Sequence, residues 1–308
     1  MISRFQTAFD TAAEALSRGV RRLSAELWRR PALSAGLLLA PPLGWFILIY
    51  LAALAALFIS AFWTVDTLTG DIIRDWTFQN FRTIFESATN INIALRTLGI
   101  ATAVTATDIL LAFPFAYFMA RIATPRQRVI LSTLVLVPLW SSYLARVYAW
   151  RLIFAGDGLL NWSLRHLGFD GVNIGYTNWA MWIVFSYIWL PFMIMPIYAA
   201  LERIPFSLFE ASQDLGAKAW RTLFRVILPL SMPGVVAGSI FTFSLTLGDY
   251  ITPVLVGGPG STFIGNVVYN NVGITNNVPF AAAYATIPLV VMALYLAAAR
   301  RTGAFEHM

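Results

Sequence analysis

A few charged and aromatic residues stand inside long apolar stretches of this 308-residue chain, and the candidate chemistry is concentrated there. Asp108 and Asp249 interrupt two such stretches, Tyr250 follows Asp249, and Trp140 and Tyr143 lie close together in a third. A charge in an apolar segment is costly and is therefore a candidate functional residue. A carboxylate beside aromatic rings attracts an organic cation, because ion pairing adds to cation–π contacts of about 0.5–2 kcal/mol each. We therefore predict that Asp249 and the three aromatic residues line the path of such a cation.

Other interpretations of these charged residues stay open. Asp108, which we include in the predicted path, is also placed to pair with a polar group of a neighbouring helix or subunit. Arg146, also included, suits a carboxylate on a substrate, or it extends toward lipid phosphate. Tyr148 and Trp150 are typical of the aromatic belt at a membrane surface.

Enzymatic chemistry has little support in the sequence. The chain has no cysteine, which excludes disulfides and thiolate metal sites, and its two histidines, His166 and His307, are far apart. The glycine-rich segment 257–262 lacks the lysine of a phosphate-binding loop. Neither a Gly-x-Ser-x-Gly elbow nor a His-Glu-x-x-His helix occurs. We therefore expect no catalytic residue, metal or cofactor in this chain. The alternative of an integral-membrane enzyme has no nucleophile–base pair in the sequence to support it.

The elements that position these residues are predicted to be membrane-spanning helices. Hydrophobic residues make up 58% of the chain and charged residues only 12%, which is too little charge to cover a soluble globular surface. About 20 apolar residues are needed to cross a bilayer core of roughly 30 Å. The sequence predicts an all-α membrane protein with six spans, over residues 33–63, 93–120, 129–149, 179–201, 233–256 and 280–299.

Basic residues are distributed unevenly between the two sides of these spans. Fifteen of the 21 lysines and arginines lie in the N-terminal segment, the loops after spans 2 and 4, and the tail. Because positively charged loops stay in the cytoplasm, we predict that both termini are cytoplasmic. This topology accounts for the net charge of +6 without a nucleic-acid partner. Residues 1–30 are predicted to form an amphipathic helix that lies on the lipid surface or packs on its own domain. One transmembrane domain is predicted to follow over residues 31–308.

The loop after the fourth span, residues 202–229, is unlike the other loops. Ser207 is predicted to cap a short helix, with Glu210 closing a capping box three residues later. Gly216 is predicted to end that helix, because glycine readily adopts the left-handed conformation of a helix stop. A second short helix is predicted over 217–227. Its apolar face consists of Trp220, Leu223, Phe224 and Ile227.

This loop resembles the EAA loop of bacterial ABC importer permeases. The matching pattern is Glu210-Ala211-Ser212, then Gly216, then Val226-Ile227-Leu228-Pro229, with serine instead of alanine at 212 and valine instead of isoleucine at 226. In that family the loop forms a coupling helix that docks into a groove of the ATPase subunit. The residues to which this role carries over are Glu210, Ala211, Ser212, Asp214, Gly216, Leu228 and Pro229.

The resemblance implies a whole assembly around the chain. It implies the type I importer permease fold with six transmembrane helices, in the bacterial inner membrane. It also implies a second permease subunit, as a heterodimer, and a periplasmic substrate-binding protein. ATP and magnesium belong to a partner ATPase dimer, and transport proceeds by alternating access.

Further segments are similar to the spermidine/putrescine-type permeases, which implies a polyamine substrate. These segments are residues 138–140, 144–150, 190–198, 214–217, 228–238 and 247–259. One departure is the uncharged segment 275–279, where that subfamily often carries an Arg-Asp-Trp-Pro sequence. An opine or amino acid, ferric iron and an oxyanion are alternative substrates, and an ATP-independent secondary carrier is the alternative from another class. The uncharged loop 257–279, with a short helix near 263–271, faces the binding protein or caps the cavity.

Overall fold

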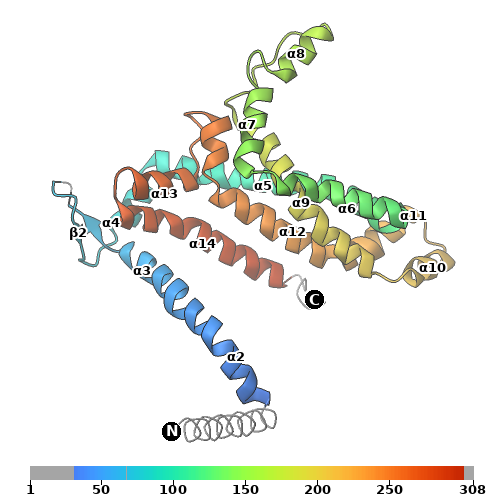
Figure 1. Cartoon of the computed structure of the whole chain (residues 1–308), viewed down its shortest axis with the longest axis horizontal. Coiled ribbons are helices and arrows are strands. Elements are labelled where there is room, and N and C mark those ends of the chain that lie inside the picture. Colours follow the sequence, from blue (N-terminus) through green and yellow to red (C-terminus); the bar gives the residue numbers. More distant parts are fainter. Residues whose placement is uncertain (1–30, 67, 302–308) are drawn as a thin grey trace, which may run out of the picture. The chain divides into compact units, whose positions relative to one another are not determined.

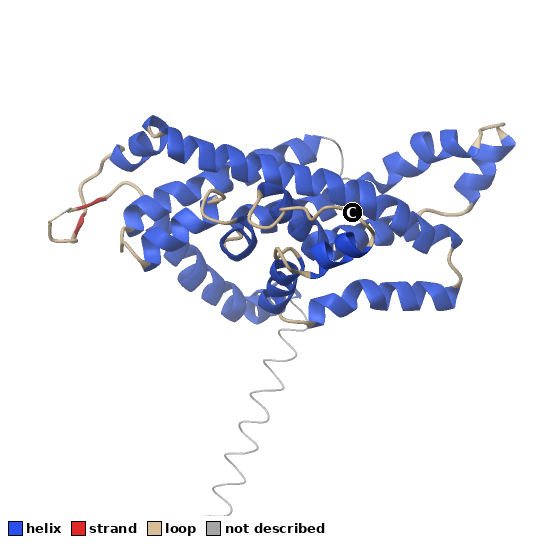
Figure 2. Cartoon of the chain, turned by 90° about the horizontal axis from the view of Figure 1, so that it is seen from above, coloured by secondary structure: helices blue, strands red, loops and turns tan. Residues whose placement is uncertain are grey.

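The computed structural model describes residues 31–66 and 68–301, and most of them are helical (Figure 2). They fall into two units, one that ends at Ile59 and one that begins at Ser60. The amphipathic helix predicted over 1–30 lies outside the described residues.

The described part of the first unit belongs to one long apolar helix built from three consecutive parts, of which the last residue, Ser60, begins the second unit. These are α2 (Pro31–Trp45), the π-helical turn η1 (Phe46–Leu51) and α3 (Ala52–Ser60). Pro41 and Pro42 lie inside α2, where proline removes backbone hydrogen bonds. Residues Ser34–Ser60 are long and apolar enough to cross a membrane, in agreement with the predicted span over 33–63.

The second unit contains the remaining elements. Its strands β1 (Thr64–Val65) and β2 (Ile72–Ile73) form a small antiparallel hairpin in which Thr64 pairs with Ile73. The helical elements that follow are α4 (Gln79–Glu86), α5 (Ala88–Tyr117), η2 (Phe118–Ile122), α6 (Pro125–Trp140), α7 (Tyr143–Ile153), α8 (Leu159–His166), α9 (Asn178–Arg203), α10 (Ser207–Asp214), α11 (Ala219–Thr222), η3 (Leu223–Ile227), α12 (Leu228–Gly248), η4 (Pro253–Gly257), α13 (Ile264–Gly273) and α14 (Val278–Arg301).

Helices α5, α9 and α12 form the centre of this unit, with α10 at one end and α13 at the other (Figure 1). Two glycines allow α12 to approach α9 closely. A Cβ at Gly234 would lie 2.5 Å from the Pro196 carbonyl oxygen, and one at Gly238 would lie 3.1 Å from the Met193 Cα. This small-xxx-small spacing is a common packing device of membrane helices, because it brings two backbones together.

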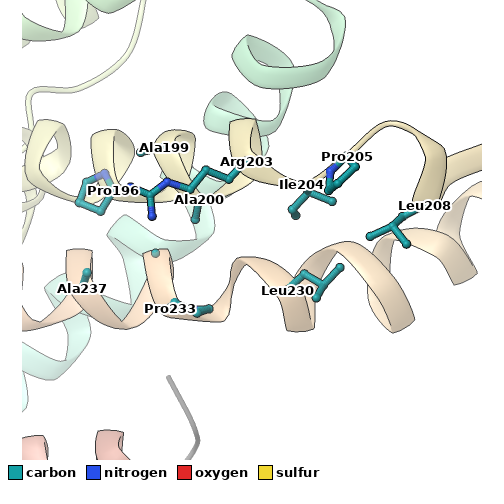
Figure 3. A pocket seen from close by; sticks show the side chains of 11 residues that line it. Pro196, Ala199, Ala200, Arg203, Ile204, Pro205, Leu208, Leu230, Pro233 and Ala237 are labelled. Atoms are coloured by element: carbon teal, nitrogen blue, oxygen red, sulfur yellow. The ribbon is translucent and has the colours of Figure 1, made fainter. Parts of the chain in front are cut away.

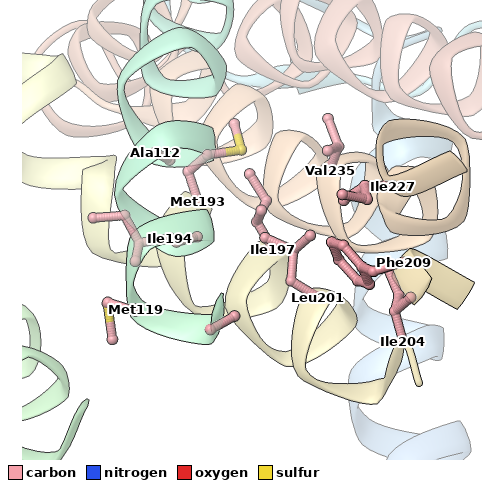
Figure 4. Close-up of a cluster of buried hydrophobic side chains, with 12 residues drawn as sticks. Ala112, Met119, Met193, Ile194, Ile197, Leu201, Ile204, Phe209, Ile227 and Val235 are labelled. Atoms are coloured by element: carbon pink, nitrogen blue, oxygen red, sulfur yellow. The ribbon is translucent and has the colours of Figure 1, made fainter. Parts of the chain in front are cut away.

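Buried side chains fill the space near the α10 end (Figure 4). We call this group the α10-end cluster, and it draws on α5, η2, α9, α10, η3 and α12. Its members are Ala112, Ala116, Met119, Ala120, Met193, Ile194, Ile197, Leu201, Ile204, Phe209, Ile227 and Val235. Because a single cluster includes residues from α10 and from three long helices, α10 is packed directly against the helix bundle.

Hydrogen bonds hold the α13 end together. The backbone N–H of Ile264 donates to Thr97 Oγ1 at 3.1 Å, and Asn266 Nδ2 donates to the Tyr250 carbonyl at 2.7 Å. Tyr284 of α14 donates to the Asn90 carbonyl at 2.7 Å. Helix α13 (Ile264–Gly273) is the short helix predicted near 263–271, and the first two of these bonds fix it against α5 and the segment that follows α12.

The third predicted span, 129–149, is wrong as a single straight helix. Helices α6 and α7 meet there at a bend of 92°. Pro138 cannot donate a backbone hydrogen bond, and its carbonyl accepts both the N–H and the hydroxyl of Ser141, at 3.2 and 2.7 Å. Ser141 and Ser142 are extended, so the helix stops and restarts in another direction.

The other spans agree with the sequence except at the fifth. Five helices in the described residues are long and apolar enough to cross a membrane, and the bent α6–α7 pair raises the number to six. The fifth span is predicted over 233–256, whereas the helix runs over Ala219–Gly248. Its predicted end is wrong because the helix stops at Gly248 and the next residue, Asp249, takes an extended conformation. Its start lies earlier because the second part of the preceding loop is already helical.

Candidate functional site

The loop between α9 and α12 begins with the short helix α10. Its first residue is Ser207, and its N-cap is Phe206, whose side chain makes no capping bond. The capping box predicted for Ser207 and Glu210 is therefore wrong. Pro205 provides the reason: its ring presets a helical φ, its carbonyl accepts the Leu208 N–H at 3.3 Å, and the turn starts before Ser207 can cap it.

One face of α10 is anchored and the other is exposed. The ring of Phe209 is 9% exposed and stacks on Phe206 with centroids 5.7 Å apart. The hydroxyl of Ser212 bonds that of Thr222 on α11 at 2.8 Å, so the serine that departs from the family pattern acts as a tether. The exposed residues are Glu210, Ala211, Gln213, Asp214 and Leu215, together with Ser207 and Leu208 in the first turn. This arrangement presents two carboxylates outward from a short, fixed helix.

Gly216 ends α10 as the sequence predicts. Its φ is 75°, in the left-handed region. Its N–H donates to the Gln213 carbonyl at 2.8 Å, and the Ala217 N–H donates to the Ser212 carbonyl at 3.0 Å. These bonds satisfy carbonyls that the helix end would leave free. Nothing lies within 4 Å of a Cβ built at Gly216, so only its backbone conformation demands glycine.

The second segment of the loop is not a separate helix. It runs from α11 through the π-turn η3 into α12 without a break. The π-turn ends two residues before Pro229, whose ring would otherwise clash with the carbonyl four residues earlier. The four residues of the predicted apolar face differ in burial, because Trp220 and Phe224 are 57% and 59% exposed whereas Ile227 is buried. Leu228 is half-buried and Pro229 is exposed at the start of α12.

A cavity of about 380 Å³ opens beside this loop, between α9 and α12 (Figure 3). It is lined by Pro196, Ala199, Ala200, Arg203, Ile204, Pro205, Leu208, Leu230, Pro233, Gly234 and Ala237. Arg203 is the charged residue of this lining, and most of the remainder is apolar.

Asp249 and Tyr143, both predicted for the substrate path, meet near the α13 end. The Tyr143 hydroxyl contacts Asp249 Oδ2 and lies 2.6 Å from Thr252 Oγ1. Asp249 Oδ1 accepts the backbone N–H groups of Ile251 and Thr252 at 2.7 and 3.0 Å, and Oδ2 also accepts the Thr252 hydroxyl at 3.3 Å. The carboxylate thus accepts four hydrogen bonds and caps the turn that follows α12.

Trp140 and Tyr250 lie apart from that pair. Trp140 ends α6 and is 89% exposed. Tyr250 stacks on Tyr269 of α13, with centroids 4.6 Å apart, and lines a cavity of about 430 Å³. The aromatic partner that does lie against Tyr143 is Trp189 of α9, with ring centroids 5.8 Å apart and planes at 13°.

The other two predicted path residues have unsatisfied polar atoms. Asp108 is fully buried on α5 near Ser186 of α9. Among residues 31–66 and 68–301, neither of its carboxyl oxygens has a partner with hydrogen-bond geometry. Arg146, half-buried one turn after Tyr143, has buried Nε and Nη1 atoms that likewise lack a partner in the described part of the chain. Arg96, in contrast, donates to the Gly260 carbonyl.

Two residues of this site were not predicted. Thr252 follows Asp249 at the three-residue spacing of a capping carboxylate, so the sequence contained a usable signal for its N–H bond. No feature of the sequence singles out Trp189, because α9 contains many aromatic and apolar residues and their spacing does not show which of them faces Tyr143.

Comparison with known proteins places the chain among transport proteins. Residues 112–303 match the family described as binding-protein-dependent transport system inner membrane component. The inner membrane ABC transporter permease protein YdcU of Escherichia coli K12 is 44% identical over 94% of this chain and 96% of its own length. The spermidine/putrescine transport system permease protein PotB of Haemophilus influenzae is 34% identical over 71% of this chain and 77% of its own length.

Solved structures show the same fold. A chain of a bacterial alginate ABC transporter, solved with an alginate-pentasaccharide-bound periplasmic protein, superposes with a TM-score of 0.66 at 21% identity, over 93% of this chain and 98% of its own. A chain of the inward-facing methionine ABC transporter MetNI gives a TM-score of 0.53 at 19% identity, over 69% of this chain and 94% of its own.

Proposed function

Because this chain belongs to the family of binding-protein-dependent transport system inner membrane components, we propose that its α10–α11 loop is the surface on which a separate ATPase acts. The chain is a multi-pass inner membrane permease subunit of an ABC importer, as its relatives are. In the proposed assembly an ATPase dimer carries ATP and magnesium, a second permease chain forms a heterodimer with this one, and a periplasmic binding protein delivers the substrate. ATP binding then opens the shared cavity outward, and hydrolysis resets it.

The single observation that carries this proposal is the two-faced construction of α10. Its inner face is fixed by Phe209 and by the Ser212–Thr222 bond, while its outer face presents Glu210 and Asp214. A helix that is bonded to the bundle on one side and free on the other can receive a force and pass it on as a rigid-body movement. The left-handed turn at Gly216 sets the direction in which the chain leaves α10.

Thiol protection tests whether an ATPase covers this face. The chain has no cysteine, so a Gln213→Cys variant carries a single reactive thiol on the exposed side of α10. We expect this thiol to react in the permease alone and to be protected in the complex with the ATPase. Asp170→Cys, exposed in the loop before α9, is the matched control and should react equally in both. Equal reaction of both thiols in the complex would contradict the proposal.

We also propose that the substrate is a polyamine. The PotB relatives, which are spermidine/putrescine transport system permease proteins, support this at 34–35% identity. The carboxylate of Asp249 beside the stacked rings of Tyr143 and Trp189 provides a charge and an aromatic surface of the kind a cation requires. Since four hydrogen bonds already occupy this carboxylate, an ammonium group binds it by displacing the Tyr143 hydroxyl.

A substrate with a carboxylate, such as an amino acid or an opine, is the second candidate. The observation that favours it is Arg146, whose Nε and Nη1 are buried without a partner in the described residues, one turn from Tyr143. Arginine recognises carboxylates in a two-pronged geometry, because its donors form a planar fork.

Two variants separate these substrates. In proteoliposomes that contain the complete transporter, Asp249→Asn should lower spermidine uptake about tenfold, the value typical of one hydrogen bond to a charged group. The asparagine oxygen can still accept the Ile251 and Thr252 N–H groups, so the turn is retained. Arg146→Gln should leave spermidine uptake unchanged. The reverse pattern, measured with an amino acid or opine, would favour the second candidate, and no effect of either variant would remove both residues from the path.

A further inference from the structure

Arg121 connects three elements at the α10 end. It stands in η2, the last turn of the helix that begins with α5. Its Nη2 donates to the carbonyl of Ile204 at 2.6 Å and also to the carbonyl of Leu201. Both carbonyls lie where α9 ends. The Leu201 carbonyl also accepts the Ile204 N–H at 3.3 Å, whereas the Ile204 carbonyl would otherwise be among the unsatisfied groups of a helix terminus. The guanidinium carbon also lies 4.7 Å from the centre of the Phe209 ring on α10.

The position of this guanidinium differs from that of its neighbours. Arg126, the second residue of α6, is exposed, and its side chain makes no hydrogen bond or ion pair within residues 31–66 and 68–301. Arg128 donates from Nε to the Ala123 carbonyl at 3.1 Å and makes a partly exposed contact with Glu202 at 4.0 Å, but neither contact reaches α10. Arg121 instead is half-buried against the α10-end cluster, where Phe209 and Ile204 pack (Figure 4). Hydrogen bonds from a charged donor are about twice as strong as neutral ones, so Arg121 holds η2 firmly to the end of α9. Its cation–π contact with Phe209 extends this link to α10.

We propose that Arg121 is a positioning residue for energy coupling: it ties α10 to the ends of α5 and α9, so that a displacement of α10 moves both helices. The inference rests on the proposed function, because it assumes that an ATPase displaces α10. It adds a residue outside the loop itself, more than eighty positions earlier in the chain than Ile204. A force applied to the exposed face of α10 reaches Phe209 first and then the guanidinium that lies against it.

The test compares substrate transported with ATP hydrolysed in the reconstituted complete transporter. We expect Arg121→Gln to lower this ratio about tenfold while ATP hydrolysis continues, because a charge-assisted bond to a carbonyl is lost. Arg121→Lys should be intermediate, since lysine keeps the charge but lacks the planar fork. Arg126→Gln removes the same charge five residues further along the chain, at the start of α6, and is expected to leave the ratio unchanged. An unchanged ratio in Arg121→Gln would overturn the inference.

Phe209→Leu keeps the test decisive should Arg121→Gln fail to insert into the membrane. The leucine keeps an apolar side chain in the cluster but removes the ring that faces the guanidinium. We expect a lowered ratio in Phe209→Leu and no further loss in the double variant with Arg121→Lys, because residues acting through one contact are not additive. A normal ratio in Phe209→Leu, or fully additive losses, would overturn the inference.

A distance measurement separates positioning from a general loss of structure. Spin labels on Leu111→Cys and Gln213→Cys, both exposed, report the separation of α5 from α10. ATP should shift this distance in the unmodified chain and should shift it less when Arg121→Gln is added, with the resting distance retained. If the unmodified transporter shows no ATP-dependent uptake at all, the proposed function fails; if it does and Arg121→Gln behaves identically, only the role of Arg121 fails.

Discussion

The backbone at Gly216 constrains which residues the loop accepts. Its φ of 75° costs an ordinary L residue about 1–2 kcal/mol, and a β-branched residue is disfavoured most. We expect Gly216→Val to abolish ATP-driven uptake, because the turn must open and α10 changes direction. Gly216→Asn should keep most of the uptake, since asparagine tolerates this conformation and its Cβ meets no atom within 4 Å.

The measurement is uptake into proteoliposomes at matched amounts of inserted permease. Insertion itself should be normal in both variants, because Gly216 is exposed at the end of a short helix. Equal loss in Gly216→Val and Gly216→Asn would mean that the absence of a side chain, and not the left-handed backbone, is what this position requires.

Individual residues could be predicted where local spacing decides their role. Gly216 was found because a glycine after a short helix is a strong local signal. Asp249 and Tyr143 were both predicted, but their contact joins residues 106 positions apart and depends on how α7 turns after the bend. The position of Trp140, exposed at the end of α6, follows from that same bend. The sequence contains the residues predicted for the path, whereas the contact between Asp249 and Tyr143 comes from the packing.

Close packing of α12 on α9 gives a prediction for these elements. A Cβ at Gly234 would lie 2.5 Å from both the Pro196 oxygen and the Ala200 Cβ. Gly234→Ala should therefore separate the two helices and destabilise the permease by about 1–3 kcal/mol, the cost typical of overpacking. The measurement is the thermal unfolding midpoint in detergent.

Gly99→Ala is the control for this substitution. Gly99 lies on α5 with nothing within 4 Å of a Cβ, so the added methyl group should raise the midpoint slightly through helix propensity. A midpoint for Gly234→Ala equal to that of the unmodified chain would show that α9 and α12 are less tightly packed than the structure has them.

Helix bounds were predictable where an uninterrupted apolar run coincides with a helix. The fourth span, predicted over 179–201 and found at Asn178–Arg203, is such a case. Apolar composition could not reveal the break after Trp140, because the residues on both sides are equally apolar. It also could not show that 219–232 continues the fifth span, since its two arginines and Pro229 look like the features of a loop. Pro229 is accommodated only because η3 widens the preceding turn.

The arrangement of the second unit leads to a prediction about membrane orientation. Residue 213 lies at the α10 end, and residue 170 lies in the loop before α9. If basic loops are cytoplasmic, a membrane-impermeant thiol reagent should label Gln213→Cys only in inverted vesicles. Asp170→Cys should be labelled only in vesicles of the native orientation. Labelling of both variants from the same side would contradict the predicted topology.

The uninterrupted helix from Ala219 to Gly248 has a mechanical consequence for the whole permease. Its 30 residues extend about 45 Å at 1.5 Å per residue. It begins beside the tether between Ser212 and Thr222 and ends at the residue before Asp249. A continuous helix is stiff along its axis, so a small axial displacement at Ala219 would move the far end by a similar distance. That end lies next to the hydrogen-bonded pair of Tyr143 and Asp249.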